Sequence, residues 1–86
     1  MFNLRSLDLN LLTVFEAIYQ LGTVSGAADH LALSQSATSH ALSRLLEACR
    51  DDLFARTRRG LSPTPVANEM YPAIKQALDE IGRAHV

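Results

Sequence analysis

Two short helical patterns follow each other in the middle of the chain, between residues 23 and 47, and a tight turn at residues 32–34 separates them. Thr23 and Ser34 precede the two patterns as N-caps, because a hydroxyl can accept a hydrogen bond from a first-turn N–H. The apolar stripe of the first pattern consists of Val24, Ala27, Ala28 and Leu31. The stripe of the second consists of Ala37, Thr38, Ala41, Leu42 and Leu45. These spacings predict two amphipathic helices, and the small residues at 27 and 28 let them cross closely.

A further helix is predicted before this pair, from residue 9 to residue 21. Asp8 is a natural N-cap, and Gly22 stands where helices commonly end in a residue with positive φ. The apolar stripe consists of Leu9, Leu12, Phe15, Ile18 and Tyr19. At this spacing the aromatic residues indicate a core, not a ligand site.

The outward face of the second central helix carries short polar side chains, whereas an ordinary solvated face is rich in Glu and Lys. They are Gln35, Ser36, Ser39, His40, Ser43 and Arg44. Short hydrogen-bonding groups at a helix N-terminus suit close approach to phosphates and base edges in a DNA major groove. The pattern favours a helix-turn-helix, and the alternative is a Ser-rich surface helix without a partner.

Residues 48–65 predict a small β-hairpin. Residues 49–52 end the helix, residues 53–57 form a short apolar run, 58–60 a turn and 61–63 a return strand. Arg56, Arg58 and Arg59 lie here with no acidic residue among them, so they would repel one another without an anionic partner. A solvated basic loop is the alternative.

The last helix is predicted to begin at Thr64 and Pro65, a capping hydroxyl followed by proline at the first helical position. Pro72 lies inside this helix and should bend it. The apolar seam consists of Val66, Met70, Ile74, Ala77, Leu78 and Ile81. A second copy of the chain is the simplest surface to cover this seam. The alternative is packing on the same domain, which we expect of the first turns.

Composition narrows the class of protein. A chain of 86 residues, 48% of them hydrophobic, makes one small folded domain for which help from a partner subunit is expected. No apolar run reaches membrane-spanning length, and the N-terminus lacks the pattern of a signal peptide. The single cysteine, Cys49, fits a reducing cytoplasm and should be a partly buried hydrophobe at a helix end. The three histidines lie at no metal-ligand spacing, so no metal or cofactor is expected.

The net charge of −1 conceals an uneven distribution. Residues 53–65 contain three arginines and no acid, whereas residues 66–86 contain three acids against one lysine and one arginine. Only the contacting face of a DNA-binding protein must meet phosphate. A basic edge on a mildly acidic body is therefore compatible with groove binding.

In sequence, these segments resemble the N-terminal DNA-binding domain of LysR-type transcriptional regulators. The similarity covers roughly residues 6–84 and includes LDLNLLTVFEAI, AADHLALSQSATSHALSRL, DDLFART and RRGLSPTP. The SQ-x-x-x-S core, the LF-x-R strand and the G-x-x-PTP exit occur in the order and spacing of that family. The LDLNLL opening and the PTP exit are most similar to nodulation-type and aromatic-degradation regulators.

The resemblance implies a mainly α fold: a winged helix-turn-helix, with a three-helix core and a hairpin wing, in residues 1–63, and a long dimerisation helix in residues 64–86. It implies a homodimer that binds an interrupted palindromic operator in double-stranded DNA, with helix 35–47 in the major groove. Family members usually continue into an effector domain that senses a small molecule and supports tetramers. That domain is absent from these 86 residues, so the chain is expected to be a truncated or natural fragment.

The resemblance also assigns roles to residues. Thr23 and Ser34 match capping hydroxyls whose neighbouring N–H groups face phosphate. The family's DNA-contacting positions match Gln35, Ser36, Ser39, His40 and Arg56. With the polar helix face and the basic hairpin added, the residues expected to contact DNA are Thr23, Ser34, Gln35, Ser36, Ser39, His40, Arg44, Arg56, Arg58 and Arg59. From the apolar seam, those expected in the dimer interface are Met70, Ile74, Ala77, Leu78 and Ile81.

Five positions depart from the family's usual pattern. Ser36 stands where proline is usual, and His40 where arginine or asparagine is common. Gly26 replaces a frequent arginine and so removes one phosphate contact. Leu46 stands where a charged residue is more usual, and Arg50 where many relatives have glycine.

Two other classes of function fit the sequence less well. An enzyme is disfavoured, because Ser39 and His40 are neighbours on a helix and point in different directions. A protein-interaction module built on a winged helix is the alternative, and it would explain the long helix but not the arginine-tipped hairpin.

Overall fold

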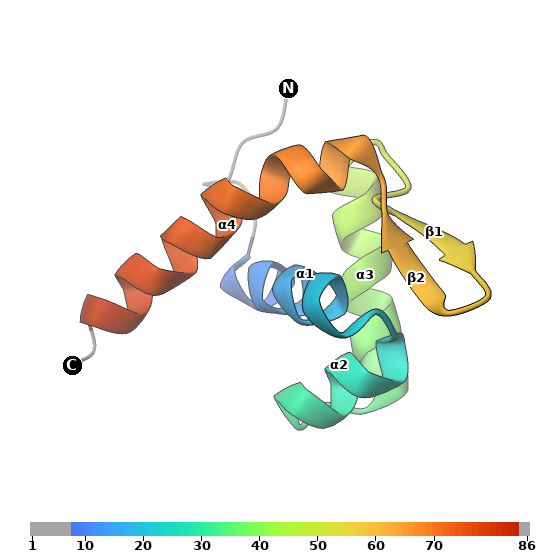
Figure 1. Cartoon of the computed structure of the whole chain (residues 1–86). Helices are drawn as coiled ribbons and strands as arrows, with labels where there is room; N and C mark the ends of the chain where they lie inside the picture. The colour runs from blue at the N-terminus through green and yellow to red at the C-terminus, as the bar shows by residue number, and fades with distance from the viewer. Residues whose placement is uncertain (1–7, 85–86) are drawn as a thin grey trace.

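The computed structural model describes residues 8–84, with side chains as far as Ile81. Residues 1–7, on which the signal-peptide prediction bears, and residues 85–86 lie outside the described residues. The described part consists of α1 (Leu9–Leu21), α2 (Val24–Leu31), α3 (Gln35–Cys49), β1 (Phe54–Thr57), β2 (Gly60–Pro63) and α4 (Pro65–Ala84). The mainly helical fold with a short hairpin is thereby confirmed. Figure 1 shows the hairpin at one side of the three-helix body and α4 extending beyond it.

Local side-chain chemistry sets the helix ends as predicted. Asp8, Thr23 and Ser34 each accept a hydrogen bond from an N–H two or three residues further on, at 2.9, 2.9 and 3.0 Å. Gly22 ends α1 with φ 78, in the left-handed region that glycine adopts without a Cβ clash. These caps place the boundaries of α1, α2 and α3.

The core forms around α1, which contacts α2, α3, α4 and β2. The largest fully buried side chains are Phe15, Ile18, Leu45, Leu53, Ile74, Val14 and Thr38. Ala27 and Ala28 are also buried, so α2 can lie close to its neighbours. The hydroxyl of Thr38 donates to the carbonyl of Ser34 at 2.9 Å, so this buried polar group is satisfied.

Three positions predicted on apolar stripes are exposed: Leu9, Ala37 and, on the last helix, Val66 at 38%. Leu9 is the first residue of α1 and is 46% exposed, whereas Leu12, three residues on and on the same side of the helix, is buried. Ala37 is also exposed, because it lies at the flank of the face that Thr38 and Ala41 bury. By contrast, Leu46 is half-buried against the core, which accounts for an apolar residue at that position.

The hairpin is confirmed, although its first strand begins one residue later than predicted and its second strand one residue earlier. β1 and β2 pair antiparallel, from Phe54 opposite Pro63 to Thr57 opposite Gly60. Leu53 was expected to begin the first strand. It instead adopts φ 58 and is fully buried, so the strand begins one residue later.

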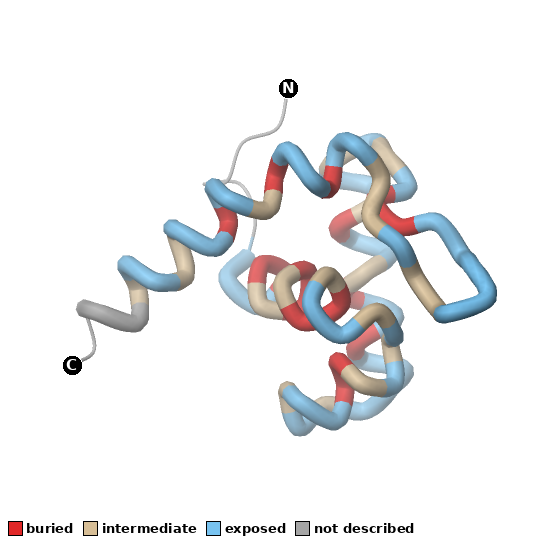
Figure 2. The backbone as a smooth tube through the Cα atoms, in the orientation of Figure 1, coloured by how far each residue is buried: buried red, intermediate tan, exposed pale blue. Residues whose placement is uncertain are grey.

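The first half of α4 packs on the domain's own core. Ala67, Met70 and Ile74 are 0%, 6% and 0% exposed, and Figure 2 shows that the buried positions of α4 lie in its first half. The side chains of Met70 and Ile74, which were predicted for the dimer interface, are thus already covered within one chain, in line with the alternative that the first turns pack on the same domain. α4 runs as one helix through Pro72.

Aromatic and amide side chains join α1 to α4. The rings of Tyr19 and Tyr71 stack with centroids 3.9 Å apart and an angle of 8° between their planes. The Tyr19 hydroxyl donates to Asn68 Oδ1 at 2.7 Å, and Gln20 Nε2 donates to the Tyr71 hydroxyl at 3.0 Å. We call these four residues the tyrosine clasp. It holds the second turn of α4 against the end of α1.

Candidate nucleic-acid interface

The polar face of α3 is exposed along its length. The inner face buries Thr38, Ala41 and Leu45. Side chains on the opposite face point to solvent, and they are Gln35, Ser36, Ser39, His40, Ser43 and Arg44. The structure thus places the predicted α3 residues on one accessible helix face.

The N-terminus of α3 is linked to α2. Gln35 Nε2 donates to Ser25 Oγ at 3.4 Å, and the Ser34 hydroxyl is engaged as the cap of α3. The bond to Ser25 uses one of the four hydrogen bonds that a glutamine amide can make. Sequence reasoning missed Ser25, because its proximity to Gln35 depends on how α2 and α3 cross.

The hairpin lies against the corner between α1 and α2. The Leu61 N–H donates to the Gly22 carbonyl at 2.7 Å across this boundary. A hollow of about 320 Å³ follows the boundary, and it is lined by Gly22, Thr23, Val24, Arg56, Thr57, Arg58, Gly60 and Leu61. The structure therefore brings Thr23, at the N-terminus of α2, together with Arg56 and Arg58.

The arginines of the hairpin are exposed and their turn is braced. Thr57 Oγ1 donates to the Gly60 carbonyl at 3.0 Å and accepts from the Arg59 N–H at 3.3 Å. Within residues 8–81, the recorded ion pair is Lys75 with Asp79, at 3.9 Å on α4. The guanidinium groups of Arg56, Arg58 and Arg59 thus make no ion pair in this part of the chain. Arg59 lies at the tip, outside the hollow.

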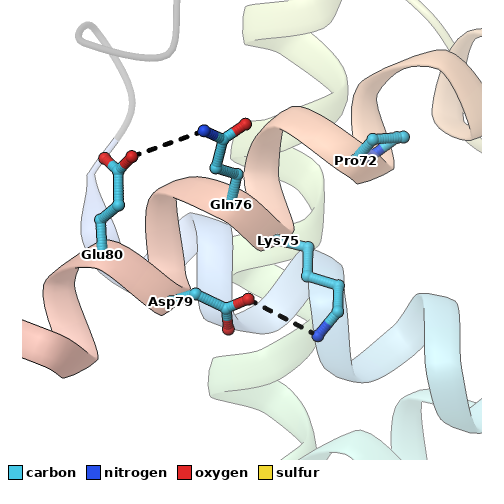
Figure 3. Close-up of a pocket in the computed structure, with 5 residues that line it drawn as sticks. All are labelled: Pro72, Lys75, Gln76, Asp79 and Glu80. Carbon is cyan, nitrogen blue, oxygen red and sulfur yellow. Dashed lines mark hydrogen bonds and ion pairs between the residues drawn. The ribbon is translucent and has the colours of Figure 1, made fainter.

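A second hollow, of about 380 Å³, lies along the exposed side of α4 (Figure 3). Lys75 pairs with Asp79, and Gln76 donates to Glu80 at 3.5 Å, so these side chains bond along their own helix. This surface is a solvated helix face.

The single cysteine and the possible metal ligands of the described residues do not indicate a chemical site. Cys49 is the last residue of α3 and half-buried against the core, as predicted. Burial, together with the nearby Asp51 carboxylate, raises the pKa of the Cys49 thiol and keeps it protonated.

In the described residues, no group of three or more His, Cys, Asp or Glu side chains could hold a metal ion. No helix in the same part is long and apolar enough to cross a membrane.

Comparison with known proteins supplies the family. A family model described as "Bacterial regulatory helix-turn-helix protein, lysR family" matches residues 9–68. The chain is 45% identical over 75 residues to the HTH-type transcriptional regulator LeuO of Escherichia coli, covering 87% of this chain and 24% of LeuO. It is 42% identical over 81 residues to the HTH-type transcriptional activator NahR of Pseudomonas putida, covering 94% and 27%. The chain thus spans about a quarter of the length of these relatives.

Comparison with solved structures also gives matches over most of the chain. The probable transcriptional regulator PA0477 from Pseudomonas aeruginosa matches with a TM-score of 0.87 and 46% identity, covering 94% of this chain and 27% of that one. The BenM DNA-binding domain in complex with catB site 1 DNA matches with a TM-score of 0.84 and 24% identity, covering 91% and 88%. At that identity the second match shows a shared fold.

Proposed function

Because this chain belongs to the LysR family of bacterial regulatory helix-turn-helix proteins, we propose that it binds specific sites in double-stranded DNA as a homodimer. The observation that carries the proposal is the exposed polar face of α3 beside a hairpin whose three arginines make no ion pair among the described residues. The relatives are named as transcriptional regulators, and this chain would supply the DNA-binding part of such a protein. That family assignment supports a binding protein over an enzyme.

In the proposed complex, α3 enters the major groove. Gln35 would contact adenine, which an amide can meet with two hydrogen bonds at once. Ser36 and Ser39 would bond base edges or phosphates, and His40 would lie at the border between base and phosphate. Their exposure on the first turns of α3 supports these roles.

Phosphate contacts would surround this helix. The N-termini of α2 and α3, capped by Thr23 and Ser34, direct N–H groups outward and favour negative charge. Arg44 would reach the DNA backbone further along α3. The hairpin arginines Arg56, Arg58 and Arg59 would bind phosphate or enter the minor groove.

The homodimer would form through the second half of α4. Ala77, Leu78 and Ile81 are half-buried and remain to pair with a second copy, whereas Met70 and Ile74 belong to the domain's own core. A two-fold dimer matches an interrupted palindrome. We propose a DNA-binding domain in residues 1–63 and a linker helix in residues 64–86. The boundary separates two roles and not two packing units, because residues of both parts contribute to one core.

Regulation by a small molecule would reside elsewhere. The relatives are about four times as long as this chain, so an effector domain and any tetramer contacts would lie in a longer protein. No cofactor is proposed for these 86 residues.

Salt dependence tests the DNA-binding proposal. Three arginines in each of two subunits can neutralise about six phosphates, which corresponds to a slope of roughly −5 in log affinity against log salt. Arg58→Ala with Arg59→Ala should reduce this to roughly −2 and weaken all sequences alike. Fluorescence anisotropy with a labelled duplex measures both quantities. Lys75→Ala, a cation lost from α4, is the control and should leave the slope unchanged.

Two outcomes would contradict the proposal. A wild-type chain that binds no duplex at low salt would favour the protein-interaction module. A double-arginine variant with an unchanged slope would remove the hairpin from the interface.

A further inference from the structure

We propose that Gly22 and Gly60 form a backbone junction that fixes the hairpin beside the N-terminus of α2, so that Gly60 is a positioning residue for phosphate binding by the arginines. The inference rests on the DNA binding proposed above. The inference assigns a role in DNA binding to two glycines, which have no side chain that could contact DNA themselves.

One hydrogen bond defines the junction. Leu61 faces Arg56 across the hairpin, and its N–H donates to the Gly22 carbonyl at 2.7 Å. Residues along an antiparallel strand alternate between bonding their partner strand and facing away from it. The Leu61 N–H therefore ties the hairpin to the corner between α1 and α2 without using a bond of the hairpin itself.

The second observation is the space at Gly60. A Cβ at this position would lie 2.5 Å from the Gly22 carbonyl oxygen and 3.3 Å from Thr23 Cγ2. Its φ of 122° is also a conformation that L side chains rarely adopt. Gly22 has φ 78, and a Cβ placed on it would lie 3.6 Å from the Leu61 carbonyl oxygen. The two backbones thus approach to a distance that a side chain at residue 60 would prevent.

The close contact between Gly60 and Gly22 places the hairpin arginines beside the N-terminus of α2. Thr23 accepts from the Gly26 N–H and so marks the N-terminus of α2, and it lines the same hollow as Arg56 and Arg58. Helix N–H groups and guanidinium groups therefore border one surface. A hairpin that moved away from Gly22 would separate them while α3 kept its exposed face.

The test combines Gly60→Ala with the arginine variant. Gly60→Ala should flatten the salt slope from roughly −5 toward the value of roughly −2 expected for Arg58→Ala with Arg59→Ala. Preference for one operator over single-base variants should persist, because α3 is unaffected. Added to the double-arginine variant, Gly60→Ala should cause a smaller further loss of affinity than in the wild type, since Arg56 is the one hairpin arginine left for it to position. Circular dichroism under the binding conditions should show the helical signal of the wild type in each variant.

Equal losses in both backgrounds would overturn the proposal, because they would mean that Gly60 acts through overall stability. Native-state hydrogen exchange of the wild-type chain gives a second test that needs no variant. The Leu61 amide should exchange far more slowly than the exposed Arg58 amide of the turn. Equal exchange rates would also overturn the junction. This measurement needs no DNA, so it separates failure of the junction from failure of the proposed function.

Discussion

Replacing Arg50 with glycine is expected to stabilise the protein. Arg50 ends α3 with φ 52 and ψ 41, a left-handed conformation that costs an L-residue roughly 1–2 kcal/mol. Losing an arginine charge at a helix C-terminus costs about 0.3–1 kcal/mol. Glycine also restores freedom to the unfolded chain, worth about 0.4–1 kcal/mol. At their mid-values these opposing terms leave a small net gain of about 0.2 kcal/mol, or a rise in Tm of about 1 °C for a chain of this size.

Thermal unfolding followed by circular dichroism measures this change, and two other positions isolate its causes. Ala32 ends α2 with φ 57 and carries no charge, so Ala32→Gly should raise the Tm by more than Arg50→Gly. High salt should narrow that difference, because it screens the charge of Arg50. Leu53 has φ 58 but is fully buried, so Leu53→Gly should destabilise by about 2 kcal/mol or more. If Arg50→Gly lowers the Tm while Ala32→Gly raises it, the assignment of strain to Arg50 is refuted.

Three further predictions concern specificity, assembly and thiol reactivity. Gln35→Ala should cost about 1–3 kcal/mol of discrimination at one base position per half-site, measured on single-base operator variants; a uniform loss would make Gln35 a phosphate contact. Leu78→Asp with Ile81→Asp should give monomers in sedimentation, because each apolar side chain contributes about 1.5–3 kcal/mol when buried, and a wild-type monomer at high micromolar concentration would contradict the pairing. Cys49 should react slowly with iodoacetamide at about pH 8 and faster as pH rises, since its pKa is raised mainly by burial and further by Asp51. Asp51→Asn should speed the reaction slightly, whereas a native rate equal to that in urea would contradict the argument.

Features that depend on local chemistry could be predicted from the sequence. Asp8, Thr23 and Ser34 cap helices through bonds to N–H groups two or three residues away, and Gly22 ends α1 in the left-handed region. Such bonds need no knowledge of the tertiary fold. The left-handed end of α3 at Arg50 follows the same rule.

Features that depend on packing between distant segments could not be predicted. The periodicity of α4 identified its apolar seam. It could not tell whether Met70 and Ile74 pack on the domain's own core or on a second copy of the chain, because either arrangement buries an apolar stripe. The candidate DNA-contacting residues of α3 and the hairpin are exposed, as a binding role requires. The pairing of Gln35 with Ser25 and the approach of Gly60 to Gly22 join residues far apart in sequence. Neither carries a local signal.

The tyrosine clasp gives the protein a built-in optical reporter. The chain has no tryptophan and only two tyrosines, Tyr19 and Tyr71, and both lie in the stack between α1 and α4. Tyrosine emission and the tyrosine bands of near-ultraviolet circular dichroism therefore arise from one contact. In these 86 residues, any event that swings α4 relative to the domain, such as the binding of a partner, can therefore be followed without a label.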